Sequence, residues 1–472
     1  MRVVFLAFLI FFFFTMPGYA QTNYTGLWEG KLIAGVEIRL FFKISRDASD
    51  KLTATLDCPD QGLKDVKVDA VSFVNDSLRL AITQFKAVYT GKLINDSVMK
   101  GIFVQGMAFP LELKKITHIV LKVRSQTPQP PFSYKSEDIT YTNKDRSIIY
   151  GATITIPSGK GPFPAALLIT GSGQQNRDEE IAGHKPFAVI ADHLTKNGFI
   201  VLRVDDRGVG QTTGSLDSAT SRDFANDALA SLDYLASRKE VDKKNIGLIG
   251  HSEGGMIAQL IGAERTDIKF IIMLAAPGIK VLDLMNEQNA AVLTSYGLSK
   301  EYISKYAPFY TTMLKTIIEN DSATFGKALT KAVGEWADTT AANIVMVTTG
   351  IKDEQTKKDF VQRTGEMAAN NWFRYFLSFD PGNYLKKIKA NVLALNGDKD
   401  IQVLSKSNLQ GIESGLKQSK SKSFEVKELK GLNHLFQECK TCTVSEYGNL
   451  DQTFSPAVLE IMTAWLKKNT KL

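Results

Sequence analysis

The chain has 472 residues, of which 44% are hydrophobic and 23% are charged, and its formal net charge is +7. These values are ordinary for a globular protein, and they exclude a largely disordered, collagen-like or coiled-coil chain. The length favours two or three structural units. Because the basic residues are spread along the chain, we expect no nucleic-acid partner.

The first twenty residues have the layout of a secretory signal peptide. Arg2 precedes an apolar run over residues 3–14, and small residues end the segment at Ala20. The run is shorter than the roughly 20 apolar residues that a membrane-spanning helix needs. We therefore predict a signal peptide over residues 1–20, no stable membrane span, and export to the periplasm or outside the cell. The oligomeric state stays open.

Residues 21–120 predict a small all-β domain, barrel-like or sandwich-like. About eight short runs show partial apolar alternation, and polar turn clusters such as residues 47–50 separate them. Residues 66–73 are predicted as one of these strands. Short strands at this spacing are typical of up-and-down barrels and sandwiches. A linker over residues 121–135, with three prolines at residues 128, 130 and 131, is predicted to follow.

From residue 136 onward, apolar strand-like runs alternate with amphipathic helical runs. This alternation predicts a mainly parallel sheet with helices on both faces. It stops at about residues 281–388, where the pattern is helical and rich in aromatic residues. It resumes at residues 391–395 and 423–429. We predict that residues 136–472 form an α/β domain with a helical cap inserted at about residues 281–388.

A Gly-x-Ser-x-Gly motif at residues 250–254 lies between a predicted strand and a predicted helix. In this context the turn must be sharp enough to expose the Ser252 hydroxyl, so its flanking positions need residues without bulk. The helix that follows directs its amide dipoles at developing negative charge. Ser252 is therefore the candidate nucleophile, and a glycine-rich packing turn is the alternative interpretation.

A serine nucleophile needs a base, and the expected chain order is serine, acid, histidine. His434 is the one of five histidines that follows Ser252, and it lies in a loop after a late strand. Asp398 and Asp400 both follow the strand over residues 391–395. We favour Asp400 as the acid that orients the base, because Asp398 fits the turn itself.

An oxyanion site needs backbone amides from the residue after the nucleophile and from the loop after an earlier strand. The expected donors are the amides of Glu253 and of Ser172 or Gly173. A phosphate-binding loop is disfavoured, because no lysine follows at the required spacing. The turn over residues 203–210 is assigned to structure, with Asp206 pairing with Arg207.

The three cysteines are predicted to have structural roles only. In an oxidising compartment Cys439 and Cys442 could form a short local disulfide, which would leave Cys58 as a buried thiol. A zinc site would need more ligands than this segment offers. We expect neither a metal nor a cofactor.

These motifs resemble the α/β-hydrolase superfamily, and within it exported carboxylesterases of the serine-aminopeptidase-like kind. The resemblance covers about residues 132–472, and such proteins sometimes carry an amino-terminal β-domain. In one departure, Thr170 stands where many relatives have a histidine. The segments that carry the resemblance are residues 170–178, 205–210, 250–255, 397–403 and 432–437.

The expected function is that of a serine hydrolase that cleaves small-molecule carboxylic esters, with short to medium acyl chains, through an acyl-enzyme. A serine peptidase or aminopeptidase on the same scaffold is the first alternative. The second is a non-catalytic binding protein in which the β-domain is the working part. The natural substrate stays open.

Overall fold

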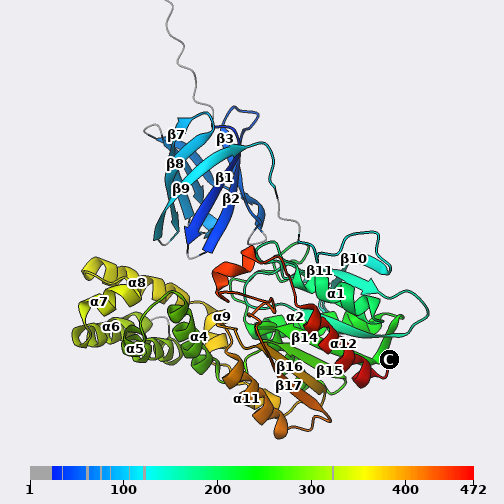
Figure 1. Ribbon diagram of the computed structural model, residues 1–472. Helices are drawn as coiled ribbons and strands as arrows, with labels where there is room; N and C mark the ends of the chain where they lie inside the picture. The colour runs from blue at the N-terminus through cyan, green and yellow to red at the C-terminus, as the bar shows by residue number, and fades with distance from the viewer. Residues whose placement is uncertain are drawn as a thin grey trace, which may run out of the picture. The chain divides into compact units, whose positions relative to one another are not determined.

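The computed structural model describes residues 24–472, except residues 35, 60–62, 75–76, 86, 106, 121–123 and 322–323. The predicted signal peptide lies outside the described residues. The chain divides into two compact units (Figure 1), an amino-terminal unit up to residue 120 and a second unit over residues 121–472, with residues 59–62 assigned to the second. None of the helices in the described part of the chain combines the length and hydropathy that a membrane crossing requires.

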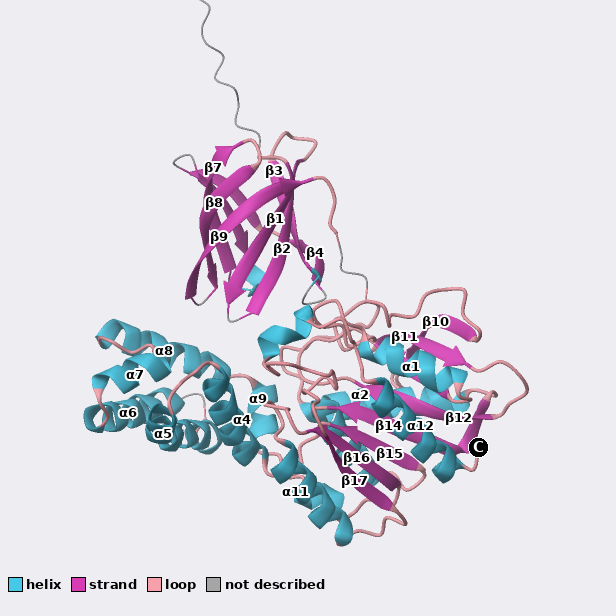
Figure 2. Ribbon diagram, viewed as in Figure 1, coloured by secondary structure: helices cyan, strands magenta, loops and turns pink. Residues whose placement is uncertain are grey.

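The amino-terminal unit is one curled antiparallel sheet (Figure 2) with the strand order β4-β3-β2-β1-β9-β8-β7-β6-β5. A short 3-10 helix, η2 (Thr83–Phe85), follows β6. The strands are β1 (Gly26–Ala34), β2 (Val36–Arg46), β3 (Leu52–Cys58), β4 (Leu63–Lys67), β5 (Ala70–Val74), β6 (Ser77–Ile82), β7 (Ala87–Asn95), β8 (Val98–Gln105) and β9 (Met107–Ile116).

Alternating side chains of this sheet form its core, as the two-residue period of a strand requires. The side chains of Trp28, Phe42 and Tyr89 are fully buried there. The predicted all-β domain is therefore confirmed. Its predicted single strand over residues 66–73 is wrong, because the chain breaks there into β4 and β5. The amide of Val68 donates to β3 and that of Asp69 to β6, so this segment crosses between the two ends of the sheet.

The second unit contains an eight-stranded sheet with the order β10-β11-β13-β12-β14-β15-β16-β17. Its pairings are parallel except those of β11 with β10 and with β13. The strands are β10 (Lys135–Thr142), β11 (Ile149–Ile156), β12 (Phe163–Ile169), β13 (Ile200–Val204), β14 (Val241–His251), β15 (Phe270–Leu274), β16 (Asn391–Gly397) and β17 (Phe424–Leu429).

Helices cover both faces of this sheet (Figure 1), which confirms the predicted α/β class. Leu248 of β14 packs into the core that includes α2 and α3, whereas its neighbour Ile249 packs into the core of α1 and α12. The helices are α1 (Pro186–Lys196), α2 (Ser221–Ser237), α3 (Glu253–Glu264), α11 (Ser405–Lys417) and α12 (Pro456–Thr470), with the 3-10 helix η3 (Val444–Asn449) before α12.

A helical insertion between β15 and β16 forms the predicted cap. Its helices share an aromatic core, in which the rings of Phe309 and Trp336 stack with their centroids 4.4 Å apart. The Arg374 guanidinium donates to carbonyls of Ile317 and Ala368, which joins α9 to α5 and α8. The helices are α4 (Val281–Ser295), α5 (Lys300–Glu319), α6 (Phe325–Thr339), α7 (Ala342–Thr349), α8 (Glu354–Ala368), α9 (Asn371–Leu377) and α10 (Gly382–Leu385).

Cys439 and Cys442 form a disulfide, with their Cα atoms 5.0 Å apart. The bond lies in the segment that follows His434, where the amide of Cys439 donates to the carbonyl of Gly431. Cys58 is buried in the amino-terminal unit.

Gly254 provides a test of how closely the turn after β14 packs against β12. A Cβ atom at Gly254 would lie 2.0 Å from the carbonyl oxygen of Ile169, whereas at Gly334 in α6 it would meet only the Lys357 amine at 4.0 Å. We expect Gly254→Ala to lower the free energy of unfolding by about 1–3 kcal/mol. Gly334→Ala should be neutral or stabilising by up to about 1 kcal/mol. Equal urea midpoints for the two variants would contradict this packing.

Candidate active site

Ser252 lies at the junction of β14 and α3, in a backbone conformation that is rare for a residue with a side chain. Its φ is 53° and its ψ is −119°, and such strain concentrates at functional sites. The Ser252 amide donates to the carbonyl of Leu274 on β15 at 2.8 Å, which holds the turn to the sheet. The Ser252 side chain lines a cavity at the carboxyl ends of the strands.

His434 and Asp400 come from the loops that follow β17 and β16. His434 Nδ1 lies 2.8 Å from Asp400 Oδ2, and the amides of Gln402 and Val403 donate to the other carboxylate oxygen. Both side chains are buried, and His434 lines the same cavity as Ser252. With Nδ1 donating to Asp400, His434 Nε2 is the ring atom that can exchange a proton.

Asp398 occupies the turn, as its place in the sequence predicts. Its carboxylate accepts the amide of Gly431 at 2.7 Å and lies 3.4 Å from the Lys430 amine. Burial opposes ionisation, but the Gly431 amide and the neighbouring lysines bring the pKa of Asp398 below its ordinary value. The structure therefore brings Asp400, and not Asp398, to His434.

The oxyanion loop, which we define as residues 170–175 after β12, approaches Ser252 closely. A Cβ atom at Gly171 would lie 3.3 Å from the Ser252 Cβ. The Gly171 amide donates to Glu179 at 2.7 Å, so it is not available to an oxyanion. Within the described residues, no hydrogen bond occupies the amides of Ser172, Gly173 or Glu253. Ser172 lines the cavity with Ser252, but Gly173 does not. The geometry therefore favours the Ser172 amide over the Gly173 amide as the second candidate oxyanion donor.

Several known proteins are similar to this chain in sequence or in fold. The family model described as serine aminopeptidase, S33, matches residues 184–325, a range that contains Ser252. Esterase EstD of Thermotoga maritima is 27% identical over 299 residues, which are 59% of this chain and 69% of that protein. The putative hydrolase YtaP of Bacillus subtilis is 31% identical over 133 residues, 25% of this chain and 44% of that protein. The crystal structure of the α/β hydrolase GrgF from Penicillium sp. sh18 covers 72% of this chain and 100% of its own, at 16% identity and a TM-score of 0.43.

The strand order of the sheet, the strained serine between β14 and α3, and the similarity to known hydrolases all indicate the same fold. The chain is an α/β-hydrolase. The predicted superfamily and fold class are thus confirmed, including the all-β domain that precedes the hydrolase unit.

The cavity of this hydrolase has a volume of about 250 Å³ and is mostly apolar. Among the described residues that line it there is no lysine or arginine, and the only acidic side chain is that of Glu179. The cap contributes Leu284, Met285 and Gln288 from α4 and Trp372, Phe373 and Phe376 from α9. Besides Ser252 and His434, the polar side chains that line it are those of Ser172, Gln175, Glu179, His251, Gln288 and Gln402.

Glu253, the residue after the nucleophile, is buried and joins the cap to the hydrolase core. Its carboxyl oxygen accepts the Ser221 hydroxyl at 2.6 Å and the Trp372 indole N–H at 2.8 Å. Burial raises the pKa of Glu253, although these hydrogen bonds oppose the shift. The side chain is therefore engaged in structure.

His251 and Glu179 are two buried side chains of the site to which the sequence pattern gave no role. His251 Nδ1 lies 3.0 Å from Glu179 Oε1, and its Nε2 lies 2.9 Å from the backbone carbonyl oxygen of His434. Burial alone would lower the pKa of His251, but the Glu179 carboxylate and the His434 carbonyl raise it above its usual value. The position of His251 directly before Ser252 was a sequence feature that could have predicted its place in the site. Glu179 lies far away in the chain, and no sequence feature indicated its place there.

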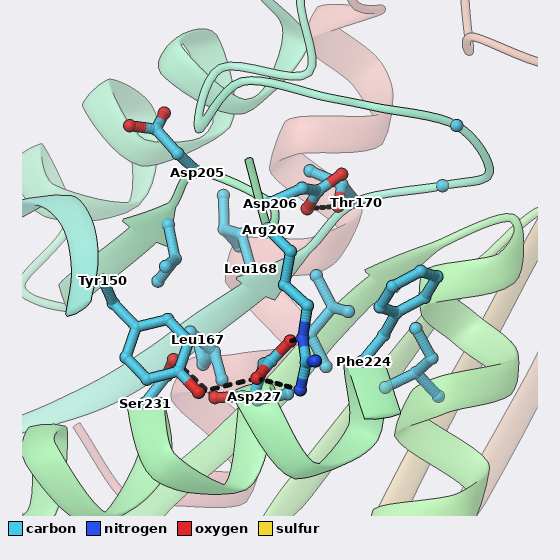
Figure 3. A pocket seen from close by; sticks show the side chains of 16 residues that line it. Tyr150, Leu167, Leu168, Thr170, Asp205, Asp206, Arg207, Phe224, Asp227 and Ser231 are labelled. Atoms are coloured by element: carbon cyan, nitrogen blue, oxygen red, sulfur yellow. Dashed lines mark hydrogen bonds and ion pairs between the residues drawn. The ribbon is translucent and has the colours of Figure 1, made fainter. Parts of the chain in front are cut away.

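A second, small cavity of about 60 Å³ lies behind the oxyanion loop (Figure 3). There the Asp206 carboxyl accepts the Thr170 hydroxyl at 2.7 Å and the Gln175 amide at 2.9 Å, so it bridges both ends of the loop. The predicted pairing of Asp206 with Arg207 is wrong. Arg207 points to Asp227 instead, as Figure 3 shows, because that carboxylate lies within reach on α2.

Asp400→Asn tests the assignment of the acid. An amide at this position can hold the wrong tautomer of His434, so we expect kcat on a p-nitrophenyl ester to fall by about 10³–10⁴-fold. Asp398→Asn should cost less than about tenfold, because its contacts are those of a surface turn. Equal losses in the two folded variants would refute the assignment.

Asp206→Asn tests whether the buried Asp206 carboxyl, behind the oxyanion loop, is protonated in the folded protein. Burial raises the pKa of Asp206 to about 8 from an ordinary 3.8, and the carboxylates of Glu179 and Glu253 add to the shift. The folded protein thus keeps a proton that the unfolded chain releases. This contribution to stability is full below about pH 4 and is lost as the pH rises through about 8.

The urea unfolding free energies of wild type and Asp206→Asn at about pH 5 and about pH 9 measure this contribution. The variant should gain stability relative to wild type as the pH rises. A difference that does not change with pH would show that Asp206 is ionised in the folded protein.

Proposed function

We propose that this α/β-hydrolase is a serine esterase that cleaves small neutral carboxylic esters with short to medium acyl groups. The observation that carries the proposal is that Ser252, in its strained turn, shares one cavity with a His434 imidazole whose Nδ1 is bound to Asp400. The similarity to an esterase of Thermotoga maritima supports the same activity.

The proposed reaction has two acyl-transfer steps. His434 Nε2 takes the Ser252 hydroxyl proton as Oγ attacks the ester carbonyl carbon, and the amides of Glu253 and Ser172 stabilise the oxyanion. His434 then gives the proton to the departing alcohol as the C–O bond breaks, which leaves an acyl-serine. Water, deprotonated by His434, attacks the acyl-serine, and the proton returns to Ser252 as the carboxylic acid leaves.

The lining of the cavity supports a neutral, partly apolar substrate. An anionic substrate would need a cation that is free to pair with it; the described lining residues include no lysine or arginine, and the imidazole of His251 is paired with Glu179. The aromatic side chains of Trp372, Phe373 and Phe376 offer contacts for an acyl or aryl group, while the glutamines can hydrogen-bond neutral oxygens. The volume of about 250 Å³ supports groups of modest size.

The peptidase alternative is less well supported. An aminopeptidase needs a carboxylate that is available to hold the free amine of its substrate. Glu179 is engaged with His251 and Gly171, and Glu253 with Ser221 and Trp372. A non-catalytic binding protein would have no need for the buried His434–Asp400 pair.

We also propose that the enzyme is exported and works in the periplasm or outside the cell. The predicted signal peptide supports this location. The disulfide between Cys439 and Cys442 supports it as well, because such bonds persist in oxidising compartments.

Two measurements test the proposed activity. A fluorophosphonate probe should label the wild type and fail to label Ser252→Ala, which should lose at least about 10⁴-fold in kcat while remaining folded. On a series of p-nitrophenyl esters, kcat/KM should be highest for short to medium acyl chains. Aminoacyl p-nitroanilides should be cleaved far more slowly.

Two results would contradict different parts of the proposed function. Absence of labelling in the folded wild type would overturn the serine mechanism and favour the binding-protein alternative. Faster cleavage of the anilides than of any ester would favour the peptidase.

A further inference from the structure

One buried pair of side chains connects three segments that the proposed reaction needs. Glu179 Oε1 accepts the amide of Gly171, in the oxyanion loop, at 2.7 Å. The same oxygen lies 3.0 Å from His251 Nδ1, on the residue before the nucleophile. His251 Nε2 lies 2.9 Å from the carbonyl oxygen of His434. A continuous set of hydrogen bonds therefore joins the oxyanion loop, the nucleophile turn and the loop of the base.

Both ring nitrogens of His251 face oxygen atoms. A backbone carbonyl can only accept, so Nε2 carries a proton. The Glu179 oxygen already accepts the Gly171 amide, and a carboxylate there also accepts from Nδ1. The arrangement is that of a doubly protonated imidazole beside a carboxylate. Both side chains are almost fully buried, with 8% and 5% of their surfaces exposed, so each charge depends on the other.

We propose that Glu179 and His251 are positioning residues, which set the oxyanion loop and the His434 backbone relative to Ser252. The inference rests on the proposed serine mechanism and extends it to two residues outside the triad. Neither residue exchanges a proton with the substrate. Their effect acts through the Gly171 amide and the His434 carbonyl.

The tight geometry around Gly171 makes small displacements costly. The Gly171 backbone lies against Ser252, and the next residue along the chain, Ser172, lines the cavity. Misplacement of a catalytic group by about 1 Å can cost on the order of 10²-fold in rate, and loss of one oxyanion donor about 10²–10³-fold. The rings of His251 and His434 are also adjacent, with centroids 4.7 Å apart.

Other acidic side chains lie around the pair and differ from it in their contacts. Glu179 and Glu253 both act on Asp206, on the side of the oxyanion loop, and Asp400 acts on His251 from the side of the base. None of Asp206, Glu253 and Asp400 bonds to both the Gly171 amide and the imidazole. The connection between the two loops therefore runs through Glu179 and His251.

Glu179→Gln is the first variant to test. The amide removes the negative charge, so His251 loses a proton and one of the three hydrogen bonds is left unmade. We expect kcat on a p-nitrophenyl ester to fall by about 10–100-fold, with KM changed by less than about threefold, since the apolar contacts to substrate are retained.

Glu180→Gln is the matched control. It makes the same chemical change one residue away, where the carboxylate contacts only Asn176 and Lys185 among the described residues. Its kcat should equal that of wild type. Rates are divided by the amount of serine that reacts with a fluorophosphonate after labelling to completion, so that misfolded protein does not count.

Substitutions of His251 separate its two hydrogen bonds. A Gln nitrogen can take the place of Nε2 and keep the bond to the His434 carbonyl, and an Asn nitrogen can take the place of Nδ1 and keep the bond to Glu179. We expect His251→Gln and His251→Asn each to retain more kcat per labelled serine than His251→Ala, and less than wild type. A pair that only stabilises the fold would change the melting temperature and leave this normalised kcat unchanged.

The outcomes distinguish this inference from the proposed function. A wild type that neither reacts with fluorophosphonate nor cleaves esters would overturn the proposed function. An active wild type with Glu179→Gln equal to Glu180→Gln in normalised kcat would overturn the positioning role alone. If Glu179→Gln does not fold, the His251 series decides, and equal normalised kcat across that series would overturn the role.

Discussion

The structure depends on one constraint, the sharp turn that joins β14 to α3. The turn holds Ser252 at a φ of 53°, and it packs so closely against β12 that a Cβ atom at Gly254 would meet the Ile169 carbonyl. Close packing there brings the oxyanion loop beside the serine. Because neighbouring parallel strands end at the same edge of the sheet, the loops after β16 and β17 deliver Asp400 and His434 to the same place.

Buried carboxyl groups surround the oxyanion loop on several sides. Asp206 bridges the two ends of the loop, Glu179 binds the Gly171 amide, and Glu253 connects the nucleophile turn to the cap through Trp372. Buried acids are costly unless they are hydrogen-bonded, and each of these has such partners. The polar contacts of this loop leave the amides of Ser172 and Gly173, the proposed oxyanion donors, without a hydrogen bond among the described residues.

Local patterns in the sequence predicted the fold class and the three triad candidates, because each lies at a strand end with a recognisable turn. Features that depend on distant contacts were missed. β10 has few apolar residues, so its alternation was weak, and the break at residues 68–69 lies within a continuing apolar pattern. The partner of Arg207 proved to be Asp227 on a later helix, and Glu179 meets His251 from 72 residues away. Neither pairing leaves a local signal.

A crystal structure of the enzyme after reaction with a small alkyl fluorophosphonate would test the central claim most directly. We expect phosphorus bonded to Ser252 Oγ, with the phosphoryl oxygen about 2.7–3.1 Å from the amides of Ser172 and Glu253. His434 Nε2 should lie within hydrogen-bond distance of Oγ or of the alkoxy oxygen. A phosphoryl oxygen turned away from both amides, or an imidazole out of reach of the modified serine, would contradict the proposed serine mechanism.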